Sequence, residues 1–404
     1  MGLPCAPVVT QRFLDVARTI TFKKGMPNQR IVYVPHPVSG RPAEVVRKHL
    51  LGTDPVTGKP ILDELIAALT KPLNAEEKKT GFVTRPARPR LLDPDTPTNL
   101  QRMMSKNGWT DGLPIVLPTE ERVAAMLKGT GHSRDEIVGT MRPSPPHEAW
   151  EYTVEMVAAN AVMAGAQPEH FPVILALAST GVTSLFSSTT SFARMVVVSG
   201  PIREEIKMNG GIGALGPFNE ANAVIGRAWT LISKNLGGAI AGETYMGGQG
   251  NNLNYNNVCI PENEEALPAG WKPLHVQKGF KPGESVVSTF TGWSLINHAG
   301  RAARDKEAFK QLLVSLSASG MGMGGSQAMI LLDPLVARDL RESFDTKEKF
   351  SAWLIQNPQN PGAPTGSPGM GSAIEILVVG GEANPCLTIG DFTYVSSASV
   401  DKWR

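Results

Sequence analysis

The sequence predicts an α/β protein with an incomplete, parallel-sheet N-terminal domain and a larger α/β domain built on a mixed sheet. Short apolar runs rich in β-branched residues alternate with helical periodicity over 404 residues, and 41% of the residues are hydrophobic, enough for sizeable cores. The N-terminal part supplies only two strand-like runs. Two parallel strands with their helices cannot bury both faces of a sheet, so we expect a partner chain to complete this domain.

The N-terminal domain is predicted over residues 1–75 in the order strand, helix, strand, helix. Its strands are expected at residues 3–9 and 30–34, and its helices at residues 10–24 and 60–71. His36 follows the second strand between two prolines. Because ligands collect at strand ends in open α/β sheets, His36 is a candidate for substrate binding; a packing or capping role is the alternative.

A linker is predicted over residues 76–106, where lysines, arginines and prolines replace the periodic pattern. The second domain then spans residues 107–404. Its strands are expected at residues 193–198, 258–260, 285–290, 328–332 and 374–379. Its helices are expected after the N-cap residue Thr119, at 149–164, 172–178, 221–235 and 303–318, after Asp333-Pro334, and at 346–356.

Composition excludes several classes of function. Lys+Arg at 39 against Asp+Glu at 37 gives a net charge of +2 without a basic block, so nucleic acid is not an expected partner. No apolar run approaches the length of a membrane span and no signal peptide is apparent, so a cytoplasmic location is expected. Cys5, Cys259 and Cys386 are far apart and lack metal-site spacing, which argues against a disulfide framework or a structural metal.

A glycine-rich loop follows the strand at 193–198 and leads into the helix at 221–235. Gly211 to Gly216 read G-x-G-x-x-G, but about ten residues separate this loop from the strand, whereas in a dinucleotide fingerprint the glycines follow the strand directly. No nucleotide cofactor is therefore favoured, and the cofactor stays unknown. A strand, a glycine loop and a helix N-terminus instead suit an anionic or carbonyl-bearing ligand.

Two further segments are rich in polar side chains. Residues 237–257 combine glycines and asparagines with Gln249; such a long loop could hold a polar uncharged group, or it could be a series of turns. Residues 184–191 carry many hydroxyl groups. A serine nucleophile there lacks a neighbouring base in the sequence.

Cys259, Glu262, Glu264 and His275 are the candidate catalytic residues. Neighbouring carboxylates raise each other's pKa, which suits general acid–base work near neutral pH. Glu262, Glu264 and His275 could alternatively bind a divalent metal. Cys259 on an apolar strand could equally be a small buried hydrophobic residue.

The runs GLPCAPVVTQRFLDVAR and KGMPNQRIVYVPHPVSGRPAEVVRKH resemble the C-terminal half of the UGSC-type selenoprotein domain, named for its Sec-Gly-Ser-Cys motif. They are more distantly similar to the selenoprotein B subunits of glycine and proline reductases. In that family the redox-active motif lies upstream of this point. The resemblance implies that a separate polypeptide supplies the motif and the first half of the domain; a domain that has lost the motif is the alternative.

Most of residues 105–300 is similar to the companion domain of UGSC proteins, through the runs VVVSGPIREEIKMNGG, GPFNEANAVIGRA, CIPENEEA and KPLHVQKGF. The chain departs from the family in two places, at Asn251 to Val258, where only Tyr255 is retained, and at Gly380 to Asn384. Both departures remove a positive charge, so the substrate is expected to differ in charge from that of typical relatives. The expected substrate-binding residues are Arg203, Asn209, Gly210, Gly211, Asn222, Arg227, Tyr255, Asn263 and His36.

The leading hypothesis is a subunit of a hetero-oligomeric, thiol- or selenol-dependent enzyme, an oxidoreductase or lyase, that breaks or makes a carbon–heteroatom bond in a small polar substrate. This chain would supply acid–base groups, and the partner would supply the Cys-Gly-Ser-Cys motif. A metal- or acid–base-dependent lyase or hydrolase that uses Glu262, Glu264 and His275 is one alternative. A non-catalytic assembly subunit is the other.

Overall fold

The computed structural model describes residues 4–81, 89–141, 150–186, 188, 189, 191–242, 244–299, 305, 328–356 and 374–404. The chain divides into two compact units. The first is built mainly from Met1–Pro94, and the second from Asp95–Pro143, Ala149–Ala239 and Met246–Arg404. None of the helices in the described residues is long and apolar enough to cross a membrane.

The first unit contains, in its described part, a parallel sheet of two short strands. β1 (Val8–Thr10) pairs with β2 (Val32–Val34), with Val8 opposite Val32. A short 3-10 turn and three helices accompany them: α1 (Leu14–Lys23), α2 (Ala43–Leu50) and α3 (Ile61–Thr70). The expected strand–helix–strand–helix order is confirmed, with the additional helix α2 after the second strand.

Polar anchors rather than a large apolar core hold the first unit together. The buried apolar cluster consists of Val32, Val34 and Ile61. The buried carboxylate of Asp54 accepts hydrogen bonds from the N–H groups of Tyr33 at 2.7 Å and Val56 at 2.7 Å. Such bonds fix local geometry, but their net contribution of about 1 kcal/mol each does not replace a core.

Helix α3 presents two apolar faces. Ile61 is buried and Leu65 packs against the small core. Leu62, Ile66 and Leu69 follow one another at helical spacing and are exposed, Ile66 by 59%. An amphipathic helix on the surface of a globular domain normally has one apolar stripe. The second stripe of α3 is therefore apolar surface that the described part of the chain does not cover.

The second unit contains two mixed sheets in its described residues. In one, the strand order is β12-β7-β5-β6, and β5 runs parallel to β6 and antiparallel to β7; in the other, the order is β10-β9-β11-β8. The first sheet consists of β5 (Ala193–Ser199), β6 (Val258–Pro261), β7 (Val286–Gly292) and β12 (Thr393–Ser399). The second consists of β8 (Leu295–Ala299), β9 (Ala328–Leu332), β10 (Ile374–Val378) and β11 (Cys386–Gly390).

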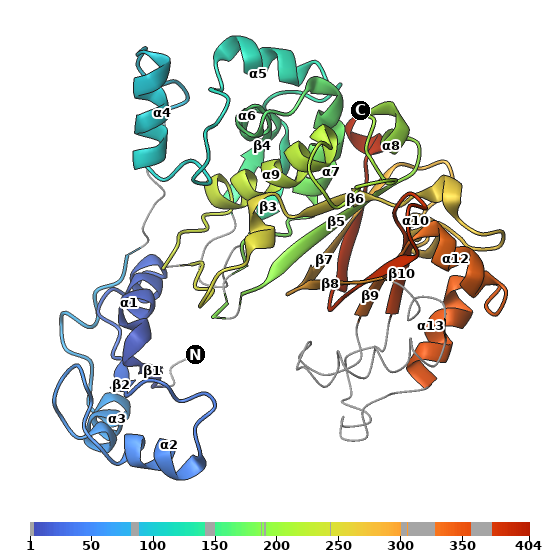
Figure 1. Cartoon of the computed structure of the whole chain (residues 1–404). Coiled ribbons are helices and arrows are strands. Elements are labelled where there is room, and N and C mark those ends of the chain that lie inside the picture. Colours follow the sequence, from blue (N-terminus) through green and yellow to red (C-terminus); the bar gives the residue numbers. More distant parts are fainter. Residues whose placement is uncertain are drawn as a thin grey trace. The chain divides into compact units, whose positions relative to one another are not determined.

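The two sheets pack face to face, and helices cover their outer faces (Figure 1). Met195 and Val197 of β5 share a buried cluster with Leu331 of β9 and Leu377 of β10. The helices around the first sheet are α5 (Glu120–Leu127), α6 (Val154–Ala164), α7 (Phe171–Ser179) and α9 (Glu220–Asn235). Those packed on the second sheet are α12 (Pro334–Arg341) and α13 (Lys347–Gln356). The predicted α/β class with a mixed sheet is confirmed.

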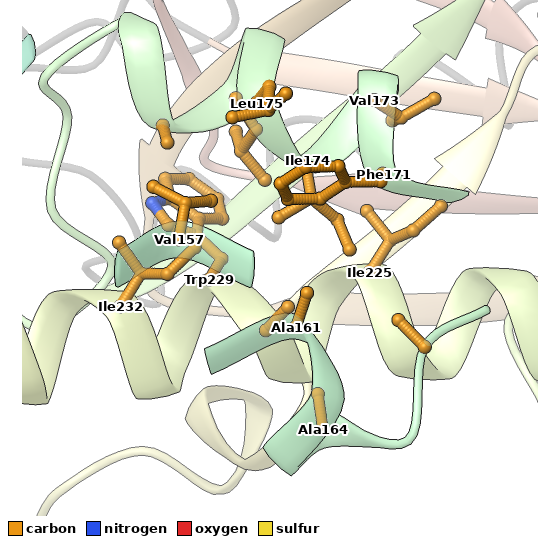
Figure 2. Packing of buried hydrophobic residues seen from close by; sticks show 14 of the residues in the cluster. Val157, Ala161, Ala164, Phe171, Val173, Ile174, Leu175, Ile225, Trp229 and Ile232 are labelled. Atoms are coloured by element: carbon orange, nitrogen blue, oxygen red, sulfur yellow. The ribbon is translucent and has the colours of Figure 1, made fainter. Parts of the chain in front are cut away.

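Figure 2 shows the core between the helices of the first sheet. Trp229 of α9 is fully buried and lies among side chains from α6 and α7, including Val157 and Ile174. Its indole N–H donates to the carbonyl of Val182 at 2.7 Å. Burial of such a large side chain with its polar atom satisfied contributes on the order of 3 kcal/mol.

Several elements differ from the prediction. Helix α6 begins at Val154, because residues 150–153 form β4 (Trp150–Thr153), which pairs with β3 (Ile137–Met141). Helix α4 (Pro97–Lys106) lies in the segment expected to be a linker. The expected helix at 303–318 lies outside the described residues, apart from Asp305. The remaining short elements of the second unit are β3, β4, α8 (Ile202–Glu205), α10 (Leu274–Gln277) and four 3-10 turns among the described residues.

Candidate functional site

The candidate site lies where the parallel strands β5 and β6 end. Parallel neighbours bring their carboxyl ends to the same edge, so the turn after Ser199 meets the turn after Pro261. Gly200 has a φ of +84°, and a Cβ there would lie 2.2 Å from the carbonyl oxygen of Glu284. Only glycine fits this turn, and the turn aims the Gly200 N–H at the Glu264 carboxylate, 2.8 Å away.

Arg203 organises this edge from helix α8. Its Nε donates to the carbonyl of Gly200 at 3.0 Å, and its Nη1 donates to the carbonyl of Glu262 at 3.1 Å. The same guanidinium forms a two-point contact with Glu265, at 2.8 and 3.2 Å, and lies 3.2 Å from Glu264 Oε1. Arg203 is buried and fully engaged within the protein. It therefore positions the two glutamates and is poorly placed to bind a substrate.

Glu264 and His275 form a buried acid–base pair. His275 Nδ1 lies 3.7 Å from Glu264 Oε1 and makes no hydrogen bond, whereas His275 Nε2 lies 3.2 Å from the carbonyl oxygen of Pro282. A carbonyl only accepts, so Nε2 carries a hydrogen and the Nδ1 of a neutral ring faces the carboxylate with its lone pair. The two groups therefore face each other at 3.7 Å without a direct hydrogen bond.

Burial raises the pKa of Glu264 above its ordinary value, while the Gly200 N–H, Arg203 and His275 oppose the shift without reversing it. Glu265, the next residue, behaves in the opposite way: hydrogen bonds from Arg203 lower its pKa to about 2. The side chain of Glu265 is 57% exposed and that of Glu264 only 12%. Adjacent glutamates thus have pKa values displaced in opposite directions, a pattern that recurs at acid–base sites.

Opposite pH dependences of stability are expected for the two glutamates. The native state holds the Glu264 proton more tightly than the unfolded chain does, so raising the pH from about 4.5 through the native pKa should lower the wild-type free energy of unfolding relative to Glu264→Gln. The ionised Glu265 stabilises the native state above about pH 4.5, and this stabilisation is lost as the pH falls towards about 2. As the pH rises through that window, the free energy of unfolding of the wild type should therefore increase relative to that of Glu265→Gln. Urea unfolding at a series of pH values measures both slopes, and slopes of the same sign would contradict the assignment.

Glu262 differs from Glu264 and His275 because all of its contacts are structural. Its carboxylate is fully buried, forms an ion pair with Lys347 Nζ, and accepts from the backbone N–H of Leu274 at 2.7 Å and of Val378 at 3.3 Å. Those contacts use both oxygens, so Glu262 ties β6 to α10, α13 and β10. Within the described ranges, no group of three or more His, Cys, Asp or Glu side chains is arranged to hold a metal ion.

The glycine-rich loop lies at the same edge but uses its amides internally. Asn209 donates to the Asn219 side chain at 2.7 Å, and Asn222 donates to the Asn209 carbonyl at 3.0 Å. The Gly210 carbonyl accepts from the N–H of Gly380 at 2.8 Å, which joins the loop to the end of β10. Gly211 donates its N–H to the Asn209 side chain at 2.9 Å, and its carbonyl accepts from the N–H of Ala214 at 3.1 Å.

Asn263 also serves this edge of the sheet. Its side chain donates to the carbonyl of Gly380 at 3.0 Å, and its backbone N–H donates to Val378 at 2.8 Å. These amides shape the loop around Gly210 and Gly380. We therefore interpret Asn209, Asn222 and Asn263 as residues that build the wall of the site.

The other expected site residues lie elsewhere. Cys259 is buried against α9, and burial raises the pKa of its thiol to about 12, so it packs as an apolar residue and is poorly suited to be a nucleophile. Arg227 forms a two-point contact with Asp111, at 2.8 and 3.0 Å, that fixes the segment before α5. Tyr255 is exposed at the end of a 3-10 turn. His36 belongs to the first unit, where its Nδ1 lies 3.2 Å from Thr10 Oγ1.

Two residues important for this edge were missing from the sequence-based set. Lys347 neutralises Glu262, and Gly380 bonds both the glycine-rich loop and Asn263. A signal for Lys347 was present, because it lies three and seven residues before Phe350 and Leu354 on the buried face of α13. A lysine on such a face indicates a buried acidic partner.

Comparison with known proteins supports the family resemblance for the N-terminal segment. Residues 1–53 match the model of the UGSC family. No curated protein and no solved structure matches the chain. The matched segment comprises β1, α1, β2 and α2 of the first unit.

Proposed function

We propose that this chain is one subunit of a hetero-oligomeric, thiol- or selenol-dependent enzyme, an oxidoreductase or lyase, that breaks or makes a carbon–heteroatom bond in a small polar molecule. A partner polypeptide carries the reactive Cys-Gly-Ser-Cys or Sec-Gly-Ser-Cys motif. This chain contributes the acid–base pair Glu264 and His275.

The proposal of a partner polypeptide rests on the composition of the first unit. Its described residues have two short strands, a three-residue apolar core and the exposed apolar stripe of α3. Parallel sheets are stable when both faces are covered, and their edges need neighbouring strands. A second polypeptide that adds strands to this sheet would cover its faces and pair with its edges. The family match over residues 1–53 favours a partner with the remaining part of a UGSC-type domain.

The acid–base role is supported by the raised pKa of Glu264 and by its position 3.7 Å from Nδ1 of His275. Cleavage of a carbon–heteroatom bond needs a proton on the leaving heteroatom, and the reverse reaction needs a base at the same place. A glutamic acid with a raised pKa, backed by an imidazole, can serve in both directions. The described cysteines are free, in keeping with a reducing compartment, and we extend the proposal to a cytoplasmic location.

Turnover by the complex tests the catalytic part of the proposal. With the partner co-expressed, dithiol-dependent conversion of a panel of small polar substrates should fall by about 100-fold or more in Glu264→Gln, the typical contribution of a general acid. Glu265→Gln is the matched control, since it alters the neighbouring carboxylate, and should change turnover by less than about threefold. Equal activity of both variants would indicate an assembly subunit. A stable, fully active homo-oligomer of this chain would overturn the proposal.

A further inference from the structure

Arg194 carries a buried guanidinium for which the described part of the chain provides no carboxylate partner. It is the second residue of β5, is 5% exposed, and its Nε makes no hydrogen bond. Among the described residues no carboxylate forms an ion pair with it, and its guanidinium lies over the ring of Phe186, with Cζ 5.4 Å from the ring centroid. Burial lowers its pKa to about 10, so it stays charged at neutral pH. An uncompensated buried charge costs several kcal/mol, and natural proteins normally pair it.

A second polar atom without a partner lies just before the neighbouring strand. Met195 of β5 is opposite Val258 of β6, and Arg194 and Asn257 are the residues that precede this pair in the chain. Arg194 shares its face of β5 with Val196, which belongs to the cluster beneath the helices. Asn257 lies just before β6 with a φ of +49°, and its side chain reaches helix α9 on the same side of the sheet. Asn257 donates to Gly226 and Thr230, each at 2.9 Å, but its Oδ1 is buried and accepts nothing.

A third such atom, Ser184 Oγ, belongs to the same polar cluster. Ser184 is 1% exposed, and its hydroxyl makes no hydrogen bond. Hydrogen bonds link it to Asn257 by way of Asn254 and Thr230: Asn254 Nδ2 donates to the Ser184 carbonyl at 3.4 Å, and Thr230 Oγ1 donates to the Asn254 carbonyl at 2.9 Å. Phe186, the residue over which Arg194 lies, follows two positions after Ser184.

The hydroxyl-rich segment 184–191 and the asparagine-rich segment 237–257 surround this cluster. The N–H of Gly248 donates to the carbonyl of Thr189 at 3.1 Å, and the side chain of Asn251 donates to the carbonyls of Ser191 and Trp293. Phe192 stacks on Trp293 with ring centroids 4.6 Å apart and meets Phe186 edge-on. The hydroxyl-rich and asparagine-rich segments are therefore joined beside an aromatic wall next to Arg194.

The three free atoms define the chemistry of a ligand. Guanidinium groups bind carboxylates through two parallel hydrogen bonds. Arg194 provides one positive charge, which suits a monoanion. Asn257 Oδ1 accepts a hydrogen bond and repels a second anionic group, so the ligand must also carry a donor. An ammonium donor would place a second cation beside Arg194, which favours a hydroxyl.

We propose that Arg194, Asn257 and Ser184 form a binding site for a small hydroxycarboxylate. The site is distinct from the Glu264–His275 pair, because Ser199 lies five positions after Arg194, about 17 Å along the strand. The proposal does not depend on the catalytic function proposed above, and it assigns a role to polar segments that the acid–base pair does not use.

Ligand-dependent stabilisation of the full chain tests this site. Glycolate at constant ionic strength should raise the midpoint of thermal unfolding by about 2–4 °C when it saturates the site. Acetate lacks the hydroxyl donor and glycolamide lacks the charge, so each should bind at least about tenfold more weakly by calorimetry. Arg194→Met should abolish the glycolate effect while leaving the protein folded, because methionine fills the same apolar surroundings without a charge. Arg134→Met, at an exposed arginine, should leave the binding constant unchanged.

Each outcome decides the question. Absence of stabilisation by glycolate in the wild type would overturn the proposal, as would glycolate binding that survives Arg194→Met. Tighter binding of inorganic phosphate or glycine than of glycolate would overturn the assigned ligand class. Asn257→Asp keeps the size of the side chain and adds a negative charge; weaker glycolate binding in this variant, by about tenfold or more, would support direct contact with the ligand.

Discussion

Lys347→Met is expected to lower the free energy of unfolding by about 3–5 kcal/mol, the usual cost of leaving one partner of a buried ion pair without the other. Lys347 and Glu262 are both almost completely buried, and their ion pair joins α13 to the end of β6. Removal of the ammonium leaves the Glu262 carboxylate with only the N–H groups of Leu274 and Val378. Chemical denaturation of the variant and the wild type measures the difference.

Two comparisons isolate this effect. Lys349→Met removes a lysine of the same helix whose ion pair with Asp345 is exposed, and should cost less than about 1 kcal/mol. The double variant Glu262→Gln, Lys347→Met removes both charges and should recover at least half of the loss. A loss below about 1 kcal/mol for Lys347→Met alone would show that the Glu262 carboxylate is not held as a buried charge, and would return Glu262 to the list of catalytic candidates.

Ile66→Asp is expected to weaken assembly with the partner polypeptide by at least about 30-fold, the size of an interface hot spot. Ile66 lies in the middle of the exposed apolar stripe of α3, and a carboxylate there would lose its water on binding without gaining a partner. The stability of the isolated chain should change little, because the side chain is exposed. Titration of the labelled chain with the partner measures the dissociation constant.

Met156→Asp is the matched control for this prediction. Met156 is an apolar residue in the first turn of α6 in the second unit and is 41% exposed. The aspartate should be tolerated near a helix N-terminus and should leave assembly unchanged. Equal affinities of the two variants would show that the stripe on α3 is not the contact surface.

Local sequence patterns predicted the elements that are strongly periodic. The buried strand β5, helix α9 and the Thr119 cap of α5 appear where apolar spacing and cap residues placed them. β12 escaped prediction because its serines and threonine lack an apolar run, and the pairing with β7, more than a hundred residues earlier, makes it a strand. For α4 the local signal existed: Thr96 caps the helix and Pro97 occupies its first turn.

The roles of the site residues depended on partners that sequence spacing does not reveal. Glu262 and Glu264 are two positions apart, yet one faces Lys347 and the other His275. Cys259 is buried because Gly226 of α9 lets the helix approach: a Cβ on Gly226 would lie 3.0 Å from the Cβ of Cys259. The absence of a carboxylate partner for Arg194 among the described residues emerged only from the packing around β5, because the sequence alone does not show what surrounds an arginine in a strand.

Hydrogen exchange of the first unit tests the central claim most directly, namely that a second polypeptide completes this unit. Exchange is followed for the amides of β1 and β2 in the chain alone and in complex with a polypeptide that carries the Cys-Gly-Ser-Cys segment of a UGSC-type domain. We predict that these amides exchange quickly in the isolated chain and at least about 100-fold more slowly in the complex, while those of β5 are protected in both. Protection of β1 and β2 in the isolated chain equal to that of β5, with no change on adding the partner, would contradict the account.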